Sequence, residues 1–346
     1  MPLSAEGTAA GHRIRFAEGG AEFTCMPGDT VLRAALRSGV SLPYECASGG
    51  CGACRVQLKC GEIEDLWPEA PGLPTRSRDR GYRLACQARP RSDCMIAARL
   101  PASGGLGPRP RRHRASLSAR EDLTHDMAQF SFVIDDAADF LPGQFALLSL
   151  PGVTGDRAYS MSNLGNEDGE WRFTIKRMVN GAGGKVLFDG LQVGDEIVLD
   201  GPYGMSYLRD SDRRDIVCIA GGSGLSPVLS ILAGAARSGH ADRKITLYFG
   251  GRRPSDLCAD LLIARDEQLD ARLTRHYAIS DPDCAEPWSG ERGYIHDIAR
   301  QHLEREGDPA ANDYYFCGPP AMTDAVQRML LELKVPVSQI FYDRFV

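Results

Sequence analysis

Residues 43–58 read PYECASGGCGACRVQL and place three cysteines within nine positions of a 346-residue chain. Four residues separate Cys46 from Cys51, two separate Cys51 from Cys54, and Cys86 follows after a further 31 residues. Three glycines lie in this loop, and glycine tolerates the positive φ that a tight turn requires. Such a turn directs backbone N–H groups toward sulfur atoms, so the stretch predicts a metal–thiolate site.

The spacing is that of the plant-type [2Fe-2S] ligand set, in which four thiolates hold two irons. A structural zinc site and free buried thiols are the alternatives, but zinc motifs usually show paired ligands at each end, and here one cysteine stands alone. Cys60 and Cys94 compete with Cys86 as the fourth ligand. Cys60 follows the loop by only five residues and Cys94 lies in a polar stretch, so we prefer Cys86. We expect ordinary thiols at the remaining positions Cys25, Cys218, Cys258 and Cys284.

The first hundred residues resemble a plant-type ferredoxin domain, which implies an α+β, β-grasp fold. Local patterns agree with that fold. Residues 12–16 and 21–25 alternate like a hairpin around Gly19 and Gly20. Helical spacing follows over 29–39, with Asp29 or Thr30 as the N-cap.

Length and composition limit the classes of protein to consider. A chain of 346 residues exceeds the roughly 250–300 residues at which single cores stop growing, so we expect two or three domains. Lys and Arg number 40 against 46 Asp and Glu, and a net charge of -6 disfavours nucleic acid as a partner. Eleven cysteines, an odd number, and an N-terminus without a signal pattern argue against a disulfide framework and favour the cytoplasm.

Changes in composition and in the expected secondary structure along the chain predict three domains, 1–105, 106–212 and 213–346. Residues 101–114 combine proline, glycine and basic residues, and we interpret them as an interdomain linker rather than a patch for an acidic partner. Short strands from 115 to 210 predict a small antiparallel β-barrel or sandwich. After 213, strands alternate with helices, including one over 256–269, which predicts a parallel α/β domain.

One uncharged stretch raises the question of a membrane span. Residues 216–236 carry no charge over 21 positions. Glycines, serines and Pro227 interrupt the stretch, which divides into a strand, a glycine turn and the start of a helix. We therefore expect no membrane span.

A short motif follows the strand FALLSL. Residues 157–160 read RAYS, and the stretch 140–163 resembles the flavin-binding barrel of the ferredoxin-NADP reductase superfamily. The resemblance implies FAD, with Arg157 on its pyrophosphate, Tyr159 packed on the isoalloxazine, Ala158 between them, and Ser160 bonded near the reactive N5. The residue types suit these roles, because guanidinium forks match phosphate and a phenol ring stacks flat.

A second element of that superfamily is a glycine-rich turn beside the flavin phosphate. Here it matches residues 180–185, NGAGGK, without the usual Ser or Thr hydroxyl. The amides of Gly183 and Gly184 can still donate to phosphate, and Lys176 or Lys185 can add charge. An ordinary glycine hairpin is the alternative.

Two further turns resemble the pyridine-nucleotide domain of the same superfamily. The first is GGSGLSP, in which Gly221, Gly222, Ser223, Gly224 and Pro227 would hold the pyrophosphate at a helix N-terminus. The second is CGPP, which would place Cys317, Gly318 and Pro319 near the nicotinamide. Without the resemblance, Cys317 is simply a buried thiol at the end of a strand.

The residues after the strand ITLYFGG leave open whether the nucleotide is NADH or NADPH. Arg252 and Arg253 follow the strand ITLYFGG, where two arginines can read a 2′-phosphate, although an arginine there can equally pair with Asp256. The family resemblance implies NADH, which we expect. Near the C-terminus, Phe345 matches an aromatic residue that packs on the flavin face in relatives, or it belongs to a plain core-plugging tail.

The order of domains resembles the reductase component of multicomponent bacterial oxygenases, with toluene and phenol monooxygenase reductases most similar. This resemblance implies an NADH-dependent oxidoreductase that sends electrons through FAD and [2Fe-2S] to a di-iron hydroxylase or an intermediary ferredoxin, with Ser160, Cys317 and Phe345 at the reacting centre. A reductase for a Rieske dioxygenase is the alternative, and a non-catalytic redox sensor is an alternative of another class. None of the seven histidines supplies a Rieske or di-iron pattern, so the chain itself is not the oxygenase.

Overall fold

The computed structural model describes residues 11–100, 107–210 and 213–343. The chain forms two compact units, and the sequence divides between them after Arg111. The expected flavin and nucleotide domains together make up the second unit. The expected boundary between those two domains, at 212/213, stays a prediction.

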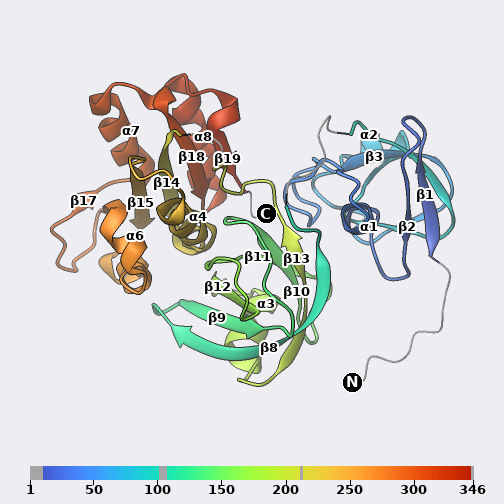
Figure 1. Ribbon diagram of the computed structural model, residues 1–346, viewed down its shortest axis with the longest axis horizontal. Helices are drawn as coiled ribbons and strands as arrows, with labels where there is room; N and C mark the ends of the chain where they lie inside the picture. The colour runs from blue at the N-terminus through green and yellow to red at the C-terminus, as the bar shows by residue number, and fades with distance from the viewer. Residues whose placement is uncertain (1–10, 101–106, 211–212, 344–346) are drawn as a thin grey trace. The chain divides into compact units, whose positions relative to one another are not determined.

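The first unit is a small mixed sheet with a short helix against it (Figure 1). Its main sheet has the order β2-β1-β7-β3-β5, with a separate β4–β6 pair. The strands β1 and β7 are parallel, whereas β1–β2 and β3–β7 are antiparallel. Thr30 caps α1 by accepting a hydrogen bond from the amide of Arg33, as one of the two predicted caps. The elements are β1 (His12–Phe16), β2 (Glu22–Cys25), α1 (Val31–Arg37), β3 (Arg55–Cys60), β4 (Ile63–Asp65), α2 (Thr75–Asp79), β5 (Tyr82–Leu84), β6 (Ala88–Pro90) and β7 (Cys94–Ala97).

The first half of the second unit is an antiparallel sheet that curls into a barrel. Its order is β11-β10-β13-β8-β9-β12, and a bridge between Met161 and Phe173 joins the two outer strands. Aromatic side chains such as Phe130, Trp171 and Phe173 fill the interior. The elements are β8 (Arg111–Asp122), β9 (Met127–Val133), β10 (Phe145–Ser149), β11 (Arg157–Ser160), β12 (Glu170–Lys176), α3 (Ala182–Lys185) with the turn Val186–Gly190, and β13 (Glu196–Tyr203).

The second half is a parallel sheet with helices on both faces (Figure 1). Its strand order is β17-β16-β15-β14-β18-β19, so successive strands are added on one side of β14 up to β17 and then on the other side from β18. Helices α4, α5 and α6 cover one face of the sheet, and α7 and α8 cover the other. Ligands of such sheets bind where the strand order reverses, at the carboxyl ends of the strands. The elements are β14 (Asp215–Gly221), the turn Gly222–Gly224, α4 (Leu225–Arg237), β15 (Ile245–Gly251), α5 (Ala259–Ile263), α6 (Glu267–Arg272), β16 (Leu273–Ile279), β17 (Glu291–Arg292), α7 (Ile295–Glu306), β18 (Asn312–Cys317), α8 (Pro320–Glu332) and β19 (Ile340–Tyr342).

The uncharged stretch 216–236 divides as predicted into β14, a glycine turn and α4. Within the described residues, no helix is both long enough and apolar enough to cross a bilayer.

Two predictions about elements are wrong. Residues 111–114 of the expected linker begin strand β8, where Arg112 pairs with buried Asp200 and Arg114 with Glu196; residues 101–106 lie outside the described residues. Partners distant in sequence thus turn a basic run into a strand. The single helix expected over 256–269 is two helices, because Asp266 caps α6 by accepting from the amide of Leu269 and so starts a new helix.

Candidate functional site

The first unit gathers the four cysteines predicted as iron ligands. The Sγ atoms of Cys54 and Cys86 lie 3.3 Å apart, and Cys46 acts electrostatically on both. The amides of Ser48 and Cys51 donate to Cys46 Sγ at 3.5 and 3.4 Å. The loop therefore turns backbone donors toward sulfur, as its glycines led us to expect.

The backbone of the loop depends on unusual torsion angles. Gly49 and Gly52 have φ of 101° and 79°, and even Ala47 has φ of 51°. A side chain at Gly52 would clash with Gly72, whose carbonyl oxygen lies 2.5 Å from the position of a Cβ. The close packing of these two glycines holds the loop closed around its sulfur atoms.

The electrostatics favour the thiolate at Cys46 and Cys54, whereas the hydrogen bond to the neighbouring sulfur and burial raise the pKa of Cys51 and Cys86. A hydrogen bond from the Cys51 thiol, with the amides of Ser48 and Cys51, lowers the pKa of Cys46 to about 4. The contact with Cys86 lowers the pKa of Cys54, while the same contact and burial raise the pKa of Cys86. The thiolate is the form that binds iron, so this donor set fits an iron–sulfur cluster.

The other two candidates for the fourth ligand lie in different surroundings. Cys60 is exposed at the end of β3. Cys94 is buried, and its thiol donates to the carbonyl oxygens of Glu62 and Ser92. Neither makes a hydrogen bond with the four gathered cysteines in the described part of the chain.

In the second unit, the RAYS motif forms strand β11 at one edge of the barrel sheet. Three carbonyl oxygens of the preceding loop, those of Thr154, Gly155 and Asp156, hold the guanidinium of Arg157 at 3.1–3.3 Å. Burial raises the pKa of Tyr159 to about 12, so its phenol stays neutral. These contacts fix the Arg157 side chain beside the barrel edge before any phosphate is bound.

Ser160 has a donor to offer. Its hydroxyl is buried and has no hydrogen-bond partner among the described residues. A buried hydroxyl without a partner is costly, and a flavin ring atom would satisfy it. The residue therefore fits the flavin role that the resemblance implies.

The glycine-rich segment 180–185 is a short helix, not a hairpin. Asn180 has φ of 61°, and α3 begins at Ala182. Gly183 lies so close to the RAYS motif that a Cβ there would be 3.0 Å from Tyr159 Oη and 3.2 Å from Arg157 Cγ. The helix end and the motif thus form one cradle, which suits a phosphate even without the missing hydroxyl.

The nucleotide turns meet where the sheet reverses. Ala220 of β14 lies beside Cys317 of β18, and a Cβ on Gly224 would be 2.0 Å from the carbonyl oxygen of Cys317. A Cβ on Gly318 would likewise be 3.2 Å from the backbone of Gly221. Only glycine permits this approach of the two turns.

The side chains near these two turns differ in charge. Burial raises the pKa of Cys317 well above its usual value, so it is a neutral thiol. Lys176 lies at the end of β12, with its stem beside Gly222 and its Nζ 2.9 Å from Asp126 Oδ2. Lys176 therefore borders the nucleotide turn, whereas we predicted it for the flavin. Phe345 lies outside the described residues.

The two arginines after β15 differ in their partners. Arg253 Nε donates to Asp281 Oδ2 at 3.1 Å, while Arg252 makes no hydrogen bond or ion pair through its side chain in the described chain. Asp256 accepts from the backbone amides of Arg252 and Arg253, at 2.9 and 3.0 Å. Asp256 therefore bonds the two arginines through their backbone, whereas the sequence left a side-chain pair open as one possibility.

Sequence reasoning missed Ser226, which joins the flavin and nucleotide halves. Its hydroxyl donates to the carbonyl oxygen of Ser160 at 2.7 Å and accepts from the amide of Thr174 at 3.0 Å. It is fully enclosed, in the first turn of α4. The only signal in the sequence is its place just before Pro227, which does not reveal the partners.

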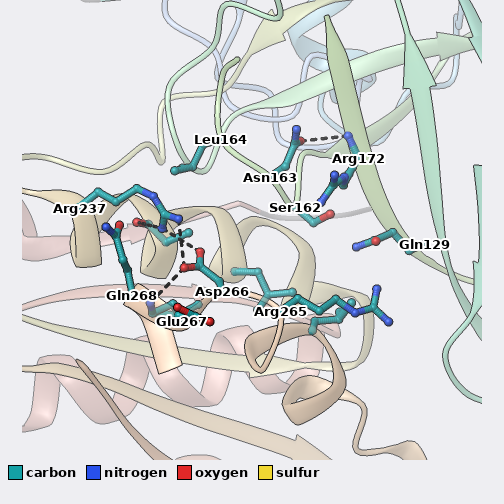
Figure 2. Close-up of a pocket in the computed structure, with 14 residues that line it drawn as sticks. Gln129, Ser162, Asn163, Leu164, Arg172, Arg237, Arg265, Asp266, Glu267 and Gln268 are labelled. Atoms are coloured by element: carbon teal, nitrogen blue, oxygen red, sulfur yellow. Dashed lines mark hydrogen bonds and ion pairs between the residues drawn. The ribbon is translucent and has the colours of Figure 1, made fainter. Parts of the chain in front are cut away.

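A separate cavity of about 510 Å³ lies between the barrel and the later part of α4 (Figure 2). Its arginines are already paired: Arg237 with Asp266 at 2.8 Å, Arg172 with Glu170 at 2.6 Å, and Arg265 with Glu121. None of the residues predicted for a cofactor lines this cavity. It carries no part of the predicted chemistry.

The chain matches three family models in this same order. Residues 15–91 match a 2Fe-2S iron-sulfur cluster binding domain, residues 114–207 an oxidoreductase FAD-binding domain, and residues 218–328 an oxidoreductase NAD-binding domain. These matches confirm the expected cofactor classes and the three-part fold.

Relatives match over almost the whole chain. The ferredoxin–NAD(+) reductase component of an alkene monooxygenase system from Xanthobacter autotrophicus is 42% identical, covering 94% of this chain and 98% of the relative. The phenol 2-monooxygenase reductase component of a Pseudomonas species is 36% identical over 92% and 90%. A solved ferredoxin reductase in carbazole 1,9a-dioxygenase has a TM-score of 0.87 at 36% identity, covering 97% and 98%. The chain is therefore an oxidoreductase that belongs to the family of oxygenase reductase components.

Proposed function

We propose that this chain takes electrons from NADH and delivers them through FAD and a [2Fe-2S] cluster to the di-iron hydroxylase of a hydrocarbon or aromatic monooxygenase. The hydrogen bond from Ser226 to Ser160 carries this proposal. It holds the flavin motif directly against the first turn of the nucleotide helix, in one compact unit. A nicotinamide in the crevice would then lie next to a flavin on the barrel.

The chemistry that the cofactors supply when bound is a change from two-electron to one-electron transfer, since a flavin accepts a hydride and a cluster carries single electrons. The protein positions them. Cys46, Cys51, Cys54 and Cys86 are the proposed iron ligands, and the amides of Ser48 and Cys51 would stabilise their charge.

The remaining site residues act by binding and orientation. Arg157 and the start of α3 at Gly183 and Gly184 would hold the flavin phosphates, Ala158 and Tyr159 would line the ring, and the Ser160 hydroxyl would donate to it. The turn 221–224 with Pro227 would hold the nucleotide pyrophosphate, bordered by Lys176 and Arg252. Cys317, Gly318 and Pro319 would lie at the nicotinamide. Phe345 remains a candidate on sequence grounds alone.

A second candidate partner is a ring-hydroxylating dioxygenase. The likeness to the ferredoxin reductase of carbazole 1,9a-dioxygenase, at a TM-score of 0.87, supports it. The monooxygenase partner is preferred because the alkene monooxygenase component is 42% identical to this chain, against 36% for the reductase of carbazole 1,9a-dioxygenase. We place the protein in the cytoplasm, because eleven cysteines, an odd number, with no disulfide among the described residues suit a reducing compartment.

Cys86→Ser tests the route. Because a hydroxyl is a poorer ligand than thiolate, the variant should lose cluster absorption and reduction of the hydroxylase while keeping FAD and NADH-dependent ferricyanide reduction. Ultraviolet-visible spectra and the two activities measure this. Cys60→Ser is the matched control and should keep the cluster. Hydroxylase reduction that persists without a cluster would disprove the route.

A further inference from the structure

Three potential metal ligands converge on the nucleotide sheet, away from the residues discussed above. His276 comes from β16, Glu291 from the two-residue edge strand β17 (Figure 1), and His302 from α7. One donor atom from each lies within 4.8 Å of the others. Glu291 Oε1 and His302 Nε2 are 3.2 Å apart.

The Glu291–His302 distance matches that between two ligands of a bound zinc ion. With Zn–N and Zn–O bonds of about 2.0–2.1 Å, tetrahedral ligands are separated by about 3.3 Å. The Glu291–His302 pair already has this separation, and the His276 donor lies within 4.8 Å of both. Two imidazoles and a carboxylate form a ligand set that zinc uses when a fourth position stays open.

Aromatic packing holds the imidazole of His276 in place but gives its ring nitrogens no hydrogen-bond partner among the described residues. Its ring stacks on Tyr248 with centroids 4.8 Å apart and meets the ring of His302 edge-on at 4.5 Å. In the described chain, neither ring nitrogen of His276 makes a hydrogen bond or ion pair. All three side chains are half-buried, so a small ion can reach them.

The cluster lies apart from the electron route. Its neighbour Tyr248 belongs to the core on the face of the sheet that α7 and α8 cover, whereas α4, which contacts the flavin motif, covers the other face. Loss of the cluster should therefore leave hydride transfer intact.

We propose that His276, Glu291 and His302 bind one zinc ion, or a divalent transition metal of the same class. The ion joins β16, β17 and α7. It closes the loop 280–290, which has only the two-residue strand β17 at its far end. Its role is to anchor the edge of the nucleotide sheet.

Zinc binding to the full-length holoprotein tests the proposal. FAD- and cluster-loaded protein is dialysed against low-micromolar zinc chloride, desalted, and analysed for zinc per chain. We expect one equivalent that His276→Ala, Glu291→Gln and His302→Gln each lose, with affinity lowered roughly tenfold or more. Zinc should also slow hydrogen exchange across 280–292 in the parent protein.

His296→Ala is the matched control, because His296 lies on α7 and pairs with Asp297 at 3.6 Å, outside the cluster. It should keep the zinc equivalent. Unchanged NADH–ferricyanide activity would show that every variant is folded. Equal zinc content in all variants, or no zinc retained by the parent protein, would overturn the proposal.

Discussion

Gly183 joins two parts of the flavin site at a single α-carbon. A methyl group there would approach Tyr159 Oη at 3.0 Å and Arg157 Cγ at 3.2 Å. Those distances are tight, so one or both side chains must shift. The absence of a side chain at this position is what lets the helix end approach the RAYS strand.

We therefore predict that Gly183→Ala weakens FAD binding about tenfold, as overpacking of this size costs about 1–3 kcal/mol. Fluorescence titration of flavin-free protein measures the affinity. Gly184→Ala is the control, because its Cβ would meet nothing nearer than 3.7 Å. Equal weakening by both substitutions would contradict the steric explanation.

Asp281 determines whether Arg253 is available to a nucleotide. The hydrogen bond from Arg253 lowers the pKa of Asp281, so the carboxylate is charged at neutral pH. The charged carboxylate holds Arg253 in an ion pair and would repel a 2′-phosphate.

We predict that Asp281→Asn raises kcat/KM for NADPH several-fold and changes the value for NADH little. Steady-state kinetics with both nucleotides and ferricyanide as acceptor measure the ratio. The parent protein should prefer NADH. Should Asp281→Asn leave the NADPH value unchanged, Arg253 does not reach the 2′ position.

At the scale of elements, α4 joins the nucleotide sheet to the barrel. Ser226 and Ser230 lie four residues apart and therefore on one helix face. Ser226 binds Ser160 and Thr174, as described above. Ser230 donates to the carbonyl oxygen of Asn163 at 2.7 Å and accepts from the amide of Gly143 at 3.3 Å.

Ser226→Ala should destabilise the second unit by about 1–3 kcal/mol, because it leaves a buried amide and carbonyl without partners. It should also slow flavin reduction by NADH in stopped-flow experiments. Ser230→Ala should cost similar stability but leave that rate nearly unchanged, since its partners lie beyond the RAYS motif. A normal rate in Ser226→Ala would mean that the bond serves stability alone.

At the scale of the whole molecule, the charge is unevenly distributed. Residues 11–100 carry thirteen Lys and Arg against ten Asp and Glu, although the chain as a whole is acidic.

Trp67 is 46% exposed, and its ring lies 3.1 Å from where a Cβ of Gly49 would be, against the cysteine loop. A large aromatic side chain in such a place is typical of a binding hot spot.

Trp67→Ala should therefore raise the KM for the hydroxylase partner at least several-fold while leaving cluster absorption and ferricyanide reduction unchanged. Titration of the partner in a coupled oxygenase assay measures this. Met26 is an apolar residue of the same unit that is 56% exposed, and Met26→Ala should have no effect. Identical behaviour of the two variants would exclude Trp67 from the docking surface.

The sequence alone predicted those features that depend on neighbouring residues. The cysteine loop is one, because the gaps between Cys46, Cys51 and Cys54 and the glycines between them restrict one short turn. The strands and helices of the parallel sheet are another, because hydrophobic periodicity is local. The family resemblance extended these patterns to the cofactor classes, which the comparisons confirm.

Tertiary structure decided the features that join distant residues. The bond from Ser226 to Ser160, the pairing of Arg253 with Asp281, and the His276–Glu291–His302 cluster connect positions 11 to 66 residues apart. Strand β8 takes in a basic run because Asp200 and Glu196 pair with it from β13. No local pattern encodes such contacts, because their energy arises only when the chain has folded and brought the partners together.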